Sequence, residues 1–217
     1  MSRPILYDYF RSSAAYRVRI ALNLKSVDYE QRQINLAKGA QKSAAYRTLN
    51  PQGFVPMLVI DGHQLTQSLA ICDYLDARFK PNPFVPRDVA ERSHVLALAL
   101  TVACDIHPLN NLRVLKYLEG TLGQAQEAKD DWYRHWVVEG LAALEAMAQP
   151  RAGAFLIGDA PSLADICLVP QLYNARRFSV PIADYPTLRR ADETASAHPA
   201  FAAAHPDRQV PHQEQAQ

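Results

Sequence analysis

A proline-rich stretch divides this sequence into two parts with different patterns. The segment at residues 80–86 reads KPNPFVP, and prolines at this density cannot continue a helix. Before it, short apolar runs alternate with helical patterns; after it, strand patterns nearly vanish. We therefore expect a first domain at residues 1–80, a linker at 81–87, an all-helical domain at 88–205 and a polar tail at 206–217 that frays.

Residues 1–80 carry the pattern of a small α/β domain. Strands are expected at 5–10, 27–36, 55–60 and 64–66, and helices at 11–25, 44–49 and 69–79. The order is βαβαββα. The first two strands are joined through a helix and should be parallel, whereas Asp61-Gly62 is typical of a hairpin turn between the last two.

The second part is read as helical. A long apolar-periodic segment covers 88–119 and is expected to bend near Pro108, and further helices are expected at 130–148, 162–175 and 186–197. Ser162 and Asp165 fit a capping box at the start of the third of these segments.

Composition excludes several classes of protein. With 23 Lys+Arg, 22 Asp+Glu and a net charge of +1, no global basic field drives nucleic-acid binding. The longest apolar stretch, 95–104, is too short to span a membrane. Three scattered cysteines do not form a disulfide framework, and Cys104 with His107 lacks the further ligands of a metal site. We expect a cytoplasmic protein that binds neither nucleic acid, membrane nor metal.

Two helix starts carry hydroxyl groups that can bind an anion. Ser12 or Ser13 is a natural N-cap for the helix at 11–25, and the local sequence fits equally well a Ser12 hydroxyl that donates to a bound thiolate. Gln67 and Ser68 precede the next long helix, where free N–H groups favour a carboxylate. Taken alone, a cap without a ligand is the simpler interpretation of that pair.

Several segments resemble the zeta class of the glutathione transferases, also called the maleylacetoacetate isomerase class. RSSAAYRVRIAL at 11–22 is similar to the SSCxxRVRIAL signature, and NPQGFVP at 50–56 resembles the loop before the family's cis-proline. QSLAI at 67–71, LAD at 163–165 and DIHPLNN at 105–111 resemble further family segments, the last one in bacterial isomerases including those of maleylpyruvate. The resemblance covers residues 4–200. It implies a thioredoxin-like N-terminal domain followed by an all-helical glutathione transferase C-terminal domain.

The resemblance implies a homodimeric, glutathione-dependent cis–trans isomerase that converts maleylacetoacetate to fumarylacetoacetate in tyrosine and phenylalanine catabolism, with glutathione transferase side activity. Maleylpyruvate isomerisation is the second hypothesis, and a non-catalytic glutathione transferase-like binding protein is the third. Ala14 stands where the signature has cysteine. This disfavours dehalogenation by a protein thiol and leaves isomerisation, which needs only the thiol of glutathione.

The resemblance also implies the site residues. Ser12, assisted by Ser13, would hold the thiolate. Arginines suit a dicarboxylate enone substrate, and those at matching positions are Arg11, Arg113 and either Arg177 or its neighbour Arg176. Asp105 would reach glutathione across the dimer interface, and the bond before Pro56 would be cis. The implied glutathione-binding residues are Val55, Pro56, Gln67, Ser68, Asp105, His107 and Asn111.

Overall fold

The computed structural model describes residues 3–210 and divides into two compact units. The first unit runs to Phe84 and takes up the chain again from His198, and the second covers Val85–Ala197. No helix among residues 3–210 combines the length and apolar character needed to cross a membrane.

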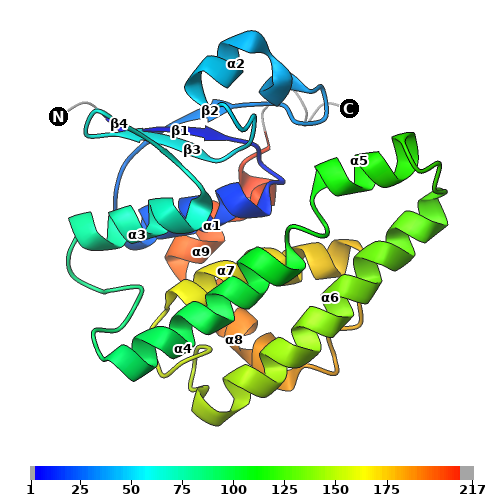
Figure 1. Ribbon diagram of the computed structural model, residues 1–217. Helices are drawn as coiled ribbons and strands as arrows, with labels where there is room; N and C mark the ends of the chain where they lie inside the picture. Colours follow the sequence, from blue (N-terminus) through cyan, green and yellow to red (C-terminus); the bar gives the residue numbers. More distant parts are fainter. Residues whose placement is uncertain (1–2, 211–217) are drawn as a thin grey trace. The chain divides into compact units, whose positions relative to one another are not determined.

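The first unit is built on a four-stranded mixed sheet in the order β2-β1-β3-β4 (Figure 1). Strand β1 (Ile5–Asp8) pairs in parallel with β2 (Glu30–Gln33) and antiparallel with β3 (Met57–Ile60), which forms a hairpin with β4 (His63–Thr66). The expected strand directions are confirmed. The first three strands are shorter than their apolar patterns, and β3 begins only after Pro56, which has no N–H to donate to a ladder.

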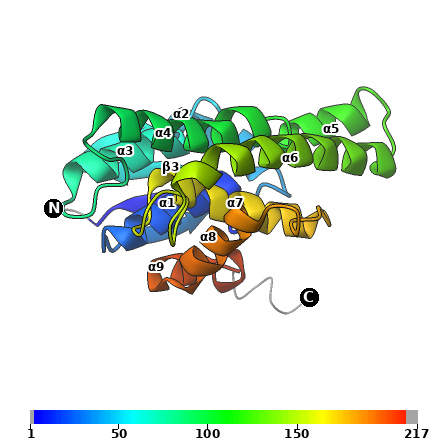
Figure 2. The ribbon, with the colours of Figure 1, turned by 90° about the horizontal axis from the view of Figure 1, so that it is seen from below.

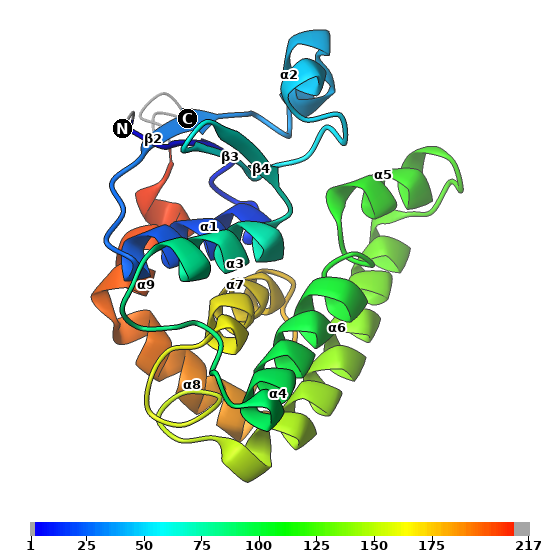
Figure 3. The same cartoon turned by 60° about the vertical axis from the view of Figure 1, so that its left-hand side comes forward.

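Helices cover both sides of this sheet. Helices α1 (Ser13–Leu24) and α3 (Ser68–Arg78) lie on one face, and α2 (Ala44–Leu49) lies on the other side (Figures 1 and 3). A short helix near the end of the chain, α9 (Pro199–Ala204), packs on α1. Helix α1 is therefore buried on nearly all sides rather than along the single apolar face that its sequence pattern indicates.

The end of the described chain belongs to the first unit, although the sequence pattern placed residues 198–205 with the helical part. Phe201 and Ala204 of α9 are fully buried, and Asn23 of α1 donates its side-chain amide to the carbonyl of Ala200 at 2.9 Å. Residues 206–208, expected to belong to a polar tail, form a 3₁₀ turn. Residues 211–217 of that expected tail lie outside the described residues.

The second unit is helical. In place of one bent helix over 88–119, two helices are separated by a turn at 107–111, where Pro108 lacks an N–H and Asn111 caps the next helix. The elements in chain order are α4 (Val89–Leu100), a π-helical segment (Thr101–Ile106), α5 (Leu112–Gly120), α6 (Gln126–Ala148), α7 (Leu163–Arg177) and α8 (Pro186–Ala197). Helices α4 and α6 run side by side, and α7 packs against α4 and α8 (Figures 1 and 2).

The start of α7 confirms the predicted capping box. The Asp165 carboxylate accepts from the backbone N–H of Ser162 and also from that of Leu156, each at 2.8 Å. Burial raises the pKa of Asp165, and these hydrogen bonds oppose the rise. The carboxylate therefore joins the preceding loop to the helix as well as capping it.

Candidate functional site

Three loops meet at one edge of the sheet in the first unit. Tyr7 of β1 lies opposite Met57 of β3, and Met57 lies opposite Thr66 of β4. Three segments therefore lie at the same edge of the sheet: the one that follows β1, the one that precedes β3 and the one that follows β4. These three loops, with the first residues of α1 and α3, contain the candidates Arg11, Ser12, Ser13, Val55, Pro56, Gln67 and Ser68.

Ser12 lies at the corner between β1 and α1. Its backbone N–H donates to the carbonyl of Tyr9 at 2.8 Å, and its hydroxyl oxygen accepts from the N–H of Ala15 at 3.2 Å. Ser12 is thus the N-cap of α1, while Ser13 is the first helical residue and is buried. Because the Ser12 oxygen accepts at the cap, its own proton remains available to a second acceptor. Capping and thiolate binding are therefore compatible.

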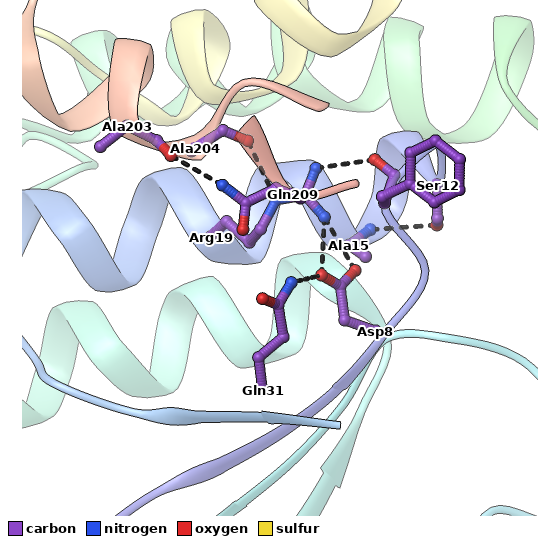
Figure 4. A network of polar contacts seen from close by, with 9 residues as sticks. Asp8, Ser12, Ala15, Arg19, Gln31, Ala203, Ala204 and Gln209 are labelled. Atoms are coloured by element: carbon purple, nitrogen blue, oxygen red, sulfur yellow. Dashed lines mark hydrogen bonds and ion pairs between the residues drawn. The ribbon is translucent and has the colours of Figure 1, made fainter. Parts of the chain in front are cut away.

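A buried ion pair holds this corner in place (Figure 4). Arg19 Nη1 donates to both carboxylate oxygens of Asp8 at 2.8 Å, and Nη2 donates to the carbonyl of Phe10 at 3.0 Å. Arg19 Nε donates to the carbonyl of Ala204 at 3.0 Å, and the Gln31 amide also donates to Asp8. The network fixes β1, β2, α1 and α9 around the turn that carries Ser12.

Sequence reasoning missed this network, although a signal was present. Asp8 interrupts an apolar run, and Arg19 lies between two apolar residues of α1; both side chains are fully buried. Buried charges of this kind are almost always paired. Burial of the nearby Tyr29 raises the pKa of its hydroxyl to about 12. The charge of Arg19 lowers this pKa, and the charge of Asp8 raises it.

The loop before β3 is held by side chains of α2 and of the residue that follows α2. The Val55–Pro56 bond is cis, as predicted. The Tyr46 hydroxyl and the Asn50 amide both donate to the carbonyl of Phe54, at 2.6 and 2.8 Å. Burial raises the pKa of Tyr46 to about 12, which keeps this hydroxyl a donor across the usual pH range.

The start of α3 joins the same loop. Gln67 has a positive φ of 67°, and its side-chain amide donates to Gln52 at 3.0 Å. Ser68 is buried, and its hydroxyl oxygen accepts from Arg17 of α1 at 3.3 Å. The structure thus brings the residues after β4 together with the loop before β3 and with α1.

In the second unit, the turn at 107–111 and the residues on either side of it carry several candidates. Asp105 is exposed, His107 is half-buried, and Asn111 caps α5 by accepting from the N–H of Arg113 at 3.1 Å. Arg113 is exposed on α5. Sequence reasoning passed over Asn110, which is buried and whose side-chain amide has no hydrogen-bond partner among the described residues. Across residues 3–210, no three His, Cys, Asp or Glu side chains are grouped as metal ligands.

One turn of α6 links this segment to the end of α7. Trp132 donates its indole N–H to the carbonyl of Leu109 at 2.8 Å, and Tyr133 stacks on Phe178 with ring centroids 3.6 Å apart. Arg134 donates to the carbonyl of Phe178 at 3.1 Å. The turn at 107–111 and the residue after α7 therefore contact the same turn of α6.

The two arginines at the end of α7 have different surroundings. Arg176 pairs with the buried carboxylate of Asp192 at 2.5 Å. The guanidinium of Arg177 lies 5.9 Å from the ring centroids of Tyr173 and Phe178 and has no ion pair within the described part of the chain. Arg177 is therefore the stronger candidate for an anionic ligand.

Comparisons with known proteins identify the family. Residues 3–77 match the N-terminal domain of glutathione S-transferases and residues 126–203 match the C-terminal domain. A probable maleylacetoacetate isomerase of Vibrio cholerae is 49% identical, covering 96% of this chain and 98% of that protein.

Two solved structures are also similar. A maleylpyruvate isomerase, a bacterial glutathione S-transferase of the zeta class, has a TM-score of 0.92 and 41% identity, covering 94% of this chain and 98% of the other. A maleylacetoacetate isomerase of Anaeromyxobacter dehalogenans, with dicarboxyethyl glutathione and citrate in its active site, has a TM-score of 0.85 and 44% identity, covering 95% of each chain. The chain therefore belongs to the zeta class of the glutathione S-transferase family.

Proposed function

We propose that the chain is a glutathione-dependent cis–trans isomerase that converts maleylacetoacetate to fumarylacetoacetate. The observation that carries the proposal is the Ser12 hydroxyl at the strand-to-helix corner, on the sheet edge that also holds Pro56 and Ser68. A hydroxyl donor and a helix N-terminus both favour a thiolate. Membership of the zeta class supports the same activity.

The chemistry needs only one nucleophile. The glutathione thiolate adds to the cis double bond of the enone, which becomes a single bond and rotates. Elimination of the thiolate then restores the double bond in the trans form and regenerates glutathione, so that no other reactant is consumed. Ser12, with Ser13 beside it, stabilises the thiolate before addition and after elimination.

Glutathione is bound chiefly by residues 1–80 in this proposal. The backbone of Val55, which precedes the cis bond to Pro56, pairs with the cysteinyl unit as an added strand would. Gln67 and Ser68 bind the γ-glutamyl carboxylate at the start of α3. Further contacts come from Asp105, His107 and Asn111, with Asp105 reaching the glutathione of the partner in a homodimer.

The dicarboxylate substrate is bound by arginines, chiefly from residues 88–205. Arg113 and Arg177 supply cations from the helical part, and Arg11 supplies one beside Ser12. Arg177 is preferred to Arg176, because Arg176 already pairs with Asp192. Planar guanidinium groups bind carboxylates through two parallel hydrogen bonds.

The test is steady-state isomerisation of maleylacetoacetate by the purified chain with glutathione, without it, and with S-methylglutathione, which lacks the thiol. We expect turnover with glutathione only. Turnover without a free thiol would refute the mechanism. Glutathione binding without turnover on any cis enone would instead indicate a binding protein.

Maleylpyruvate isomerisation is the alternative enzyme function, supported by the similarity to the maleylpyruvate isomerase. The two substrates differ in chain length, so kcat/KM on both separates the hypotheses. A kcat/KM that is equal for the two substrates or higher for maleylpyruvate would contradict the proposal that maleylacetoacetate is the substrate. We further propose a cytoplasmic homodimer, and the mass of the native protein by light scattering tests the dimer.

A further inference from the structure

A buried arginine in the first unit lacks the partners that a buried charge needs. Arg17 of α1 is only 2% exposed, and among the described residues its one hydrogen bond runs from Nη1 to the Ser68 hydroxyl oxygen at 3.3 Å. Its Nε and Nη2 atoms are buried without an acceptor among residues 3–210. Within those residues no carboxylate forms an ion pair with it.

Arg19, two residues further along α1, is also buried, but it has both a counter-ion and hydrogen-bond acceptors. Its guanidinium contacts both oxygens of Asp8 and two backbone carbonyls. Leaving a charge buried without a counter-ion costs several kcal/mol, and each unsatisfied buried polar group in a native protein needs an explanation. The contrast shows that Arg17 has no counter-ion among residues 3–210 and indicates that a bound anion supplies it.

The place where Arg17 meets Ser68 is already favourable to an anion. Ser68 is the first residue of α3, and the first turn of that helix carries no acidic side chain. Gln67, at the N-cap position, makes no side-chain hydrogen bond to the helix N–H groups. The start of α3 therefore combines three features that attract an anion. They are the free N–H groups, the positive end of the helix dipole and the buried guanidinium.

We propose that Arg17 is a positioning residue for the α-carboxylate of the γ-glutamyl unit of glutathione and acts through Ser68. The Ser68 oxygen accepts from Arg17, which leaves its own proton to donate to that carboxylate. The guanidinium charge, screened little by water at this depth, adds attraction for the same carboxylate. This inference rests on the proposed function.

The experiment compares ligands that differ in one charge. Calorimetry measures the affinity for glutathione, for an analogue whose γ-glutamyl α-carboxylate is an amide, and for a matched analogue amidated at the glycine end. The proteins are the wild type, Arg17→Met, Arg17→Lys and, as a control of equal charge loss, Arg3→Gln. Arg3 is exposed and forms an ion pair with Asp28.

In the wild type, amidation of the γ-glutamyl carboxylate should weaken binding about tenfold or more. Arg17→Met should lose most of this discrimination, Arg17→Lys should keep part of it, and Arg3→Gln should keep all of it. In Arg17→Met the KM for glutathione should rise while kcat at saturating glutathione is unchanged. A purely structural role would weaken all three ligands equally.

If Arg17→Met discriminates between glutathione and the γ-glutamyl amide as strongly as the wild type does, this inference is overturned and the proposed function is not. Absence of glutathione binding by the wild type overturns the proposed function and this inference with it. If neither Arg17 variant folds, a crystal structure of the wild-type chain with glutathione decides. The γ-glutamyl carboxylate is expected on Ser68 with Arg17 behind it, and a carboxylate bound elsewhere overturns the inference.

Discussion

Arg19 and Asp8 form an ion pair in which neither side chain is exposed to solvent, with Nη1 of Arg19 2.8 Å from both carboxylate oxygens. The same guanidinium donates to the carbonyl of Phe10, within the turn that leads to Ser12. The pair therefore sets the position of the hydroxyl that we assign to thiolate stabilisation.

Breaking this pair should destabilise the fold strongly. Arg19→Met leaves the Asp8 carboxylate buried and unpaired, and we expect the free energy of unfolding in urea to fall by about 3–5 kcal/mol. Arg3→Met breaks an exposed pair with Asp28 and should cost less than about 1 kcal/mol. Equal losses in the two variants would contradict the assigned role of the buried pair.

Removing the Ser12 hydroxyl should raise the pKa of the bound glutathione thiol toward the free value, because a donor to the charged form is lost. The absorbance of the thiolate, followed against pH in the complex, measures that pKa directly. In Ser12→Ala we expect kcat to fall at least about tenfold while glutathione still binds.

Ser13→Ala is the matched control for Ser12→Ala. Ser13 is buried as the first residue of α1, and its substitution should move the thiol pKa less than that of Ser12. A larger shift of the thiol pKa in Ser13→Ala than in Ser12→Ala would make Ser13 the main donor to the thiolate and Ser12 the assisting residue. An unchanged thiol pKa in both variants would assign activation of the sulfur to another group.

Arg176 and Arg177 should respond differently to substitution. Arg177→Ala should raise the KM for the dicarboxylate substrate about tenfold or more, because charge-assisted hydrogen bonds are lost, and should leave the KM for glutathione nearly unchanged. If the KM for glutathione rises instead of the KM for the substrate, the assignment of Arg177 to the substrate is wrong.

Arg176→Ala should affect stability in a pH-dependent way. Burial raises the pKa of Asp192 and Arg176 opposes the rise, so ionised Asp192 destabilises the folded chain as pH rises through its folded pKa. Removing Arg176 raises that pKa further. The loss of unfolding free energy should therefore be small near pH 4 and grow to about 2 kcal/mol at pH 7. A loss that shrinks with rising pH would refute this pairing.

Gly140 of α6 should resist substitution. An added Cβ there would lie 2.2 Å from Cγ1 of Ile106, in the π-helical segment that packs against α6. Gly140→Ala should lower the free energy of unfolding by about 1–3 kcal/mol. At Gly120 nothing lies within 4 Å of an added Cβ, so Gly120→Ala should be neutral or stabilise by up to about 1 kcal/mol. Thermal melts of both variants check the difference in sign.

Local sequence patterns determined much of this protein. Hydrophobic period and turn residues predicted the βαβαββα order of elements along the chain, the hairpin at Asp61-Gly62 and the capping box of Ser162 and Asp165, because each depends on residues close in the chain. Resemblance to the zeta class supplied the cis bond before Pro56 and the list of candidate site residues, whose roles remain proposals.

The tertiary structure decided what depends on residues far apart in the chain. It placed α9 against α1, paired Arg19 with Asp8, set Arg17 against Ser68 and gave Arg176 rather than Arg177 a carboxylate partner. A sequence pattern reports which positions are buried, but the partner of a buried charge is fixed only when distant segments pack together. For that reason the hydroxyl at the corner was visible in the sequence, whereas the contacts that hold it in place were not.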